Sequence, residues 1–160
     1  MTTQLKRSGI AAAVMAVALG VAASAMAGQS FRLDIGHPIA GSTSTKMTKA
    51  VLMVRGLACD DPASIRMTGT AEGFVNGARR SMPLELSETM PGVFAVPRPP
   101  NGQWVLNLLG TCPGRNATAS AIVPLGGPSG FLREKAEFSD APAKPERVSA
   151  SLITLTTGTK

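Results

Sequence analysis

Apolar and polar residues alternate along much of the chain after residue 30, with the period of a β-strand that has one covered face. In the first such segment Phe31, Leu33 and Ile35 alternate with charged residues. No segment has both the period and the length of a convincing helix, and residues 131–138 suit either a short strand or one or two helical turns. The strands we predict are 31–35, 50–55, 67–75, 78–86, 92–96, 104–109, 117–123 and 148–156.

Two pairs of consecutive strands are expected to form β-hairpins. Asn76-Gly77 stands between the third and fourth predicted strands and favours a type I′ turn, because both residues tolerate positive φ. Pro83 in the second arm has no N–H to donate to a sheet, so that arm is predicted to be an edge strand. The fifth and sixth strands are expected to pair through the proline-rich connector 97–103.

Seven or eight short strands without a long helix predict an all-β fold. An antiparallel β-sandwich is the expected architecture, and a small barrel is the alternative. Cys59 follows an early strand and Cys112 a late one, which suits a bridge within a sandwich. The expected fold is immunoglobulin-like only in a loose sense, because no Trp stands shortly after the first cysteine, and Trp104 instead lies eight residues before the second.

The first 27 residues are predicted to be a cleaved signal peptide. A basic pair at 6–7 is followed by an apolar stretch, and Ala-Met-Ala at 25–27 provides the small residues that signal peptidase reads. The mature chain is then a single β-sandwich domain, residues 28–160, in the periplasm or outside the cell. The alternative is an uncleaved anchor, because the apolar stretch approaches the roughly 20 residues that span a bilayer.

Charge and cysteine content narrow the class of protein. Removal of the two basic residues in the signal peptide lowers the net charge from +6 to about +4. No basic run is interleaved with aromatic residues, so the sequence does not indicate a nucleic-acid-binding protein. Cys59 and Cys112 are the only cysteines, and an even number in an oxidising compartment indicates a disulfide. Their spacing does not fit a CxxC redox motif.

The remaining reactive residues do not form a recognisable catalytic or metal-binding motif. His37 is the only histidine and is interpreted as structural or exposed, because no nucleophile motif accompanies it. The five methionines after residue 27 lack copper-binding spacing and are interpreted as core residues. Asp60-Asp61 lacks the alternating ligands of a calcium loop and is interpreted as a solvated turn. We predict no catalytic residue, no cofactor and no metal.

Arginines provide the one candidate binding site. Arg79 and Arg80 follow the hairpin turn and Arg98 lies in the proline-rich connector, and guanidinium groups suit carboxylates and phosphates. The alternative is that they protect an edge strand from pairing with other chains.

The sequence therefore predicts an exported, non-catalytic β-sandwich protein that binds a partner protein or an envelope component. No nucleic acid and no membrane span after signal removal are expected. The alternatives are a small periplasmic carrier for a metal ion or small ligand, and an enzyme whose site has no recognisable motif.

Overall fold

The computed structural model describes residues 30–38, 49–126 and 130–158. The predicted signal peptide and the polar connector 41–48 lie outside these residues. The first of two antiparallel sheets holds, in spatial order, β1 (Arg32–Gly36), β2 (Ala50–Leu57), β6 (Val93–Pro97) and β5 (Ser87–Met90). The second holds β10 (Glu137–Ser139), β8 (Ala117–Gly126), β7 (Gln103–Cys112), β3 (Arg66–Val75) and β4 (Ala78–Pro83), and β9 (Gly130–Phe131) also pairs with β8.

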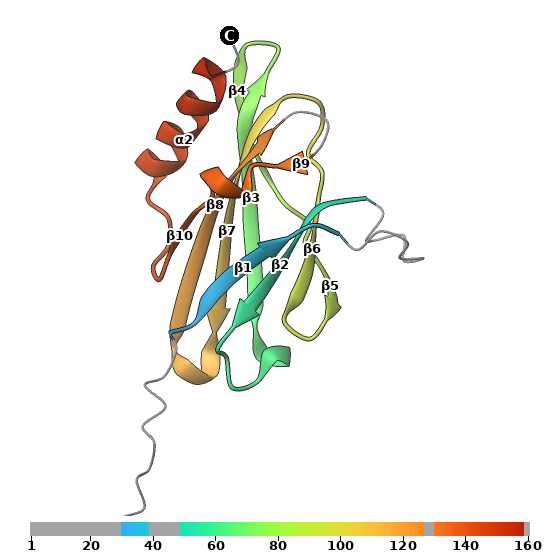
Figure 1. Cartoon of the computed structure of the whole chain (residues 1–160), viewed down its shortest axis with the longest axis vertical. Helices are drawn as coiled ribbons and strands as arrows, with labels where there is room; N and C mark the ends of the chain where they lie inside the picture. The colour runs from blue at the N-terminus through green and yellow to red at the C-terminus, as the bar shows by residue number, and fades with distance from the viewer. Residues whose placement is uncertain (1–29, 39–48, 127–129, 159–160) are drawn as a thin grey trace, which may run out of the picture.

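The two sheets form the sandwich that the sequence predicts (Figure 1). The described residues contain ten strands, more than the seven or eight expected. The additional strands are β5, β9 and β10, which have four, two and three residues. Such short strands are stabilised by pairing with their neighbours and are too short to show a period of two in the sequence.

The main core lies between the sheets and is formed by alternate residues of the central strands. Leu52 and Val54 of β2 and Leu106 and Leu108 of β7 have no exposed surface. Their neighbours in sequence point the other way, as successive side chains in a strand must. Each fully buried side chain of this size contributes about 1.5–3 kcal/mol through removal from water.

The prediction of a last strand over 148–156 is wrong, because this segment lies in an α-helix, α2 (Pro145–Thr157). Its β-branched residues favour a strand locally, but Val148, Leu152 and Leu155 also fall on one face of a helix. That face packs on Val105 and Ile122, on the outer face of the second sheet (Figure 1). Burial against this sheet outweighs the local preference. No helix in the described residues is long and apolar enough to span a membrane.

The first predicted hairpin is confirmed and the second is wrong. Asn76 and Gly77 join β3 to β4 with φ of 51° and 77°, and β4 is an edge strand that ends at Pro83 rather than at residue 86. β6 instead pairs with β2 and β5, whereas β7 pairs with β3 and β8. The connector between β6 and β7 therefore crosses from one sheet to the other.

Residues 131–138 contain both of the structures considered for them. They include Phe131 at the end of β9, the 3-10 helix η3 (Arg133–Lys135) and the start of β10. The Arg133 guanidinium donates to the Ile35 carbonyl and lies 3.0 Å from Asp34 Oδ1. These bonds attach η3 to β1, so this turn connects the two sheets at one side of the sandwich.

The predicted disulfide between Cys59 and Cys112 is confirmed, with Cα atoms 5.8 Å apart. It connects the segment after β2 to the end of β7, and so joins the two sheets. Beside it, Arg115 Nε and Nη2 donate to Asp60 Oδ1 at 3.0 and 2.5 Å. These hydrogen bonds, with the charge of Arg115, lower the pKa of Asp60 from its ordinary value.

Candidate functional site

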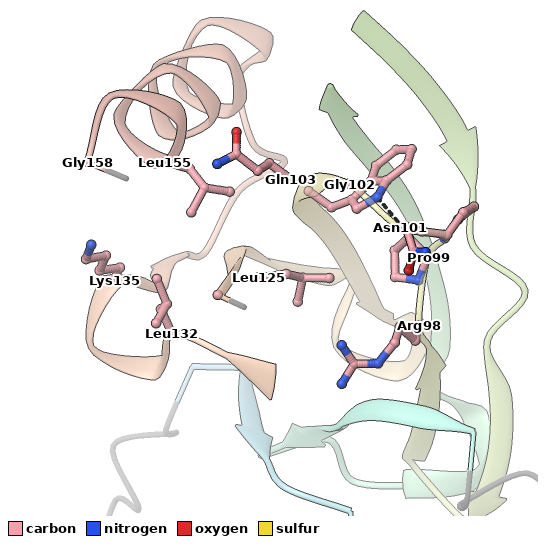
Figure 2. A pocket seen from close by; sticks show the side chains of 13 residues that line it. Arg98, Pro99, Asn101, Gly102, Gln103, Leu125, Leu132, Lys135, Leu155 and Gly158 are labelled. Carbon is pink, nitrogen blue, oxygen red and sulfur yellow. Dashed lines mark hydrogen bonds between the residues drawn. The ribbon is translucent and has the colours of Figure 1, made fainter. Parts of the chain in front are cut away.

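A cleft of roughly 500 Å³ lies where the β6–β7 connector, the end of β8, η3 and the last turn of α2 meet (Figure 2). The connector, the segment from β8 to η3 and the end of α2 are distant from one another in sequence, and the sandwich brings them together. The residues that line the cleft are Arg98, Pro99, Pro100, Asn101, Gly102, Gln103, Trp104, Leu125, Gly126, Leu132, Lys135, Leu155 and Gly158.

One wall is the connector, which Trp104 holds in place. The Trp104 Nε1 group donates to the Pro100 carbonyl at 2.7 Å, shown by the dashed line in Figure 2. The indole itself packs on Gly73 of β3, where a Cβ would lie 2.6 Å from two ring carbons. Gly73 is required here because any side chain would occupy the place of the ring. Trp104 therefore fixes the connector to the second sheet.

The start of the connector is also fixed. The backbone N–H of Arg98 donates to the Lys49 carbonyl at 3.3 Å, beside the start of β2. Pro97 and Pro99 flank Arg98 and restrict φ on both sides of it. The connector is thus bonded at Arg98 and at Pro100, and its prolines limit its conformations further.

The opposite wall and the floor are apolar. Leu125 of β8 lies at the centre of the cleft and Leu155 of α2 lies to one side (Figure 2). Leu132 approaches Gly126 so closely that a Cβ on Gly126 would lie 2.6 Å from Leu132 Cδ2. The Leu132 N–H donates to the Pro124 carbonyl at 2.9 Å, which fixes its backbone to β8.

The charges that line the cleft are all positive. The guanidinium of Arg98 points into the cleft from the connector, and Lys135 lies on the opposite side beside Leu132 (Figure 2). The chain has ten acidic residues, and all of them lie in the described ranges but none among the lining residues. Lys135 is also near the last turn of α2, where a cation interacts favourably with the helix dipole.

Of the three predicted binding arginines, only Arg98 lines the cleft. Arg79 Nη2 lies 2.6 Å from Glu72 Oε2 and 2.9 Å from Ser149 Oγ, so it attaches β4 to β3 and α2. Arg80 is its exposed neighbour in β4, and so it points to the other face of the sheet. The structure therefore does not gather the three arginines around one cavity.

The other residues considered in the sequence have structural contacts. The ring of His37 lies 4.7 Å from that of Phe131 at an interplanar angle of 35°. Asp61 caps the 3-10 helix η1 (Pro62–Ser64), since its Oδ1 accepts from the Ala63 N–H at 3.0 Å. The described ranges contain no group of three or more His, Cys, Asp or Glu side chains that could hold a metal ion.

Most of the cleft could not be found from the sequence. Leu125, Leu132, Lys135 and Leu155 come from three elements whose proximity depends on the packing of α2 and η3 on β8. Only the connector gave a signal, through its prolines and Arg98.

Comparison of the chain with family models, with curated protein sequences and with solved structures gives no match. The class of the protein is therefore taken from its fold and its cleft. It is a disulfide-linked antiparallel β-sandwich with a helix on one outer face and an apolar, positively charged cleft.

Proposed function

We propose that this chain is an exported, non-catalytic β-sandwich protein that binds an envelope component in the cleft. The observation that carries the proposal is the cleft itself. Its volume of roughly 500 Å³ lies within the range of small-molecule sites, and it combines apolar walls with a few polar groups.

The fixed walls of the cleft also support binding. Trp104 and the backbone of Arg98 attach the middle and the start of the connector, and Leu132 is attached to β8. When a ligand enters such a cleft, little of the surrounding protein chain has to become ordered. The conformational entropy lost on binding is then small, which favours affinity.

Export is supported by two independent features. Residues 1–27 have the organisation of a signal peptide. The Cys59–Cys112 disulfide is of the kind that persists outside the cytoplasm. Mass spectrometry of the protein recovered from the envelope is expected to give an N-terminus at Gly28, within a residue or two. An intact Met1 on that protein would instead indicate an uncleaved anchor.

The cleft is tested with a neutral fluorescent probe, N-phenyl-1-naphthylamine, excited directly at wavelengths that tryptophan does not absorb. Leu155→Trp places a larger ring in the cleft and is expected to lower probe affinity at least severalfold, because it fills the apolar space. The matched control is Ile153→Trp on the same helix, since Ile153 is 58% exposed and does not line the cleft.

Circular dichroism and thermal unfolding check that both variants keep the fold. If both variants lose probe affinity equally, or if the wild-type protein does not bind the probe, the proposed site is contradicted.

A further inference from the structure

We propose that the ligand of the cleft is an amphipathic anion, a monomeric molecule with an apolar body that ends in one anionic group such as a carboxylate. The side chain of Arg98 binds that group. This inference rests on the proposed function, because it specifies the ligand of the same cleft.

The apolar body is matched by the three leucines. Leu125, Leu132 and Leu155 come from β8, the segment before η3, and α2, and all three line the cleft (Figure 2). Leu132 and Leu155 are only partly buried, so apolar surface remains exposed to water. A ligand that covers it gains about 25 cal/mol for each Å² removed from water.

The anionic group is matched by Arg98. Five other arginines of the described segments form ion pairs with acidic residues: Arg55, Arg79, Arg115, Arg133 and Arg147. In the part of the chain that the structure describes, Arg66, Arg80 and Arg98 form no ion pair, and of these three only Arg98 lines the cleft. Its planar N–H groups can bind a carboxylate through two parallel hydrogen bonds.

Arg98 is better suited than Lys135 to be the primary anion-binding residue. Lys135 shares a neighbouring pocket beside α2 with the acidic Glu137, whose charge lowers the positive potential on that side. Arg98 lies away from that helix, on the connector, and its backbone is fixed by the bond to Lys49 and by two prolines. Lys135 adds a second positive charge on the opposite wall. This charge raises the preference of the cleft for anionic ligands, although Arg98 makes the direct contact with the anionic group.

The test compares two probes that differ in a single group. 1-Anilinonaphthalene-8-sulfonate carries the ring system of N-phenyl-1-naphthylamine plus one sulfonate, which here stands in for the carboxylate. The wild-type protein is expected to bind the sulfonate about tenfold more tightly than the neutral probe at low salt, as expected for one charge-assisted hydrogen-bonded contact. Added salt should reduce this ratio, because it screens exposed charges.

Arg98→Gln is expected to bring the ratio of the two affinities close to one. The matched control is Arg66→Gln, the same change at an exposed arginine that does not line the cleft, and it should leave the ratio as in the wild-type protein. If Arg80→Gln lowers the ratio and Arg98→Gln does not, the anion binds at β4 and the inference is wrong.

The natural ligand class is tested by displacement of the neutral probe. Dodecanoate is expected to displace it at about tenfold lower concentration than dodecan-1-ol, which has the same chain without the charge. Equal displacement would overturn the inference and leave the proposed function intact, whereas no displacement by either and no probe binding would overturn both. A different outcome is that the protein sediments with phosphatidylglycerol vesicles while dodecanoate fails to displace the neutral probe. That result would indicate a membrane surface as the partner and would also overturn the inference.

Discussion

Replacement of Trp104 by alanine is expected to lower the free energy of unfolding by about 3–5 kcal/mol, the range for a large aromatic side chain removed from a core. Trp104 is 3% exposed and packs on Gly73, so the substitution leaves a cavity above a residue that has no side chain to fill it. It also removes the bond to the Pro100 carbonyl, which fixes the connector. Urea unfolding followed by circular dichroism measures the change.

Trp104→Phe is the matched variant, because it keeps an aromatic ring over Gly73 and loses the indole N–H. We expect it to cost clearly less than the alanine variant, with about 1 kcal/mol from the lost hydrogen bond and the remainder from the smaller ring. Both variants should bind N-phenyl-1-naphthylamine more weakly, since one wall of the cleft is released. An alanine variant as stable as the wild-type protein would contradict the role assigned to Trp104.

Removal of the disulfide is expected to lower the free energy of unfolding by about 2–4 kcal/mol. Cys59 and Cys112 are 53 positions apart, and the entropy of closing such a loop gives an upper value of about 4 kcal/mol. The change to make is Cys59→Ser with Cys112→Ala, because Cys112 has no exposed surface and a serine there would bury a hydroxyl group.

The disulfide prediction is checked by urea unfolding and by thiol titration. Denatured, unreduced wild-type protein is expected to have no free thiol, and denatured, reduced protein to have two. Reduced wild-type protein should unfold at a urea concentration close to that of the double variant. If the oxidised, reduced and double-variant proteins all unfold at the same concentration, the disulfide does not stabilise this fold.

The parts of the fold that depend on local sequence could be predicted from it. Asn76-Gly77 specifies its turn through the positive φ that both residues adopt, and Pro83 marks an edge because it lacks an N–H. The segment 148–156 could not be assigned by composition, since its β-branched residues suit a strand while Pro145 and Glu146 before it suit the start of a helix. As a helix, this segment buries its apolar face against Val105 and Ile122 of the second sheet, and this burial favours the helix over a strand.

β6 and β7 do not pair with each other: β6 pairs with the distant β2, and β7 pairs with the distant β3. Both strands are adjacent in sequence, which favours a hairpin, but each already has two partners on its own sheet. The same reason limits prediction of the cleft: Arg98 is visible in the sequence, whereas Leu125, Leu132 and Leu155 share a cavity only after the strands have found those partners.

The position of β6 and β7 in different sheets also affects how fast the chain can fold. Leu52 lies opposite Val96 and Thr70 opposite Asn107, so the central strands pair with segments that are far away in sequence. Each of these pairings closes a long loop and loses chain entropy before any core contact compensates for it. Chains dominated by such contacts fold roughly in milliseconds to seconds, slower than chains built from local hairpins and helices. We therefore expect the sheet crossing at the connector to slow folding relative to a chain built only from consecutive hairpins.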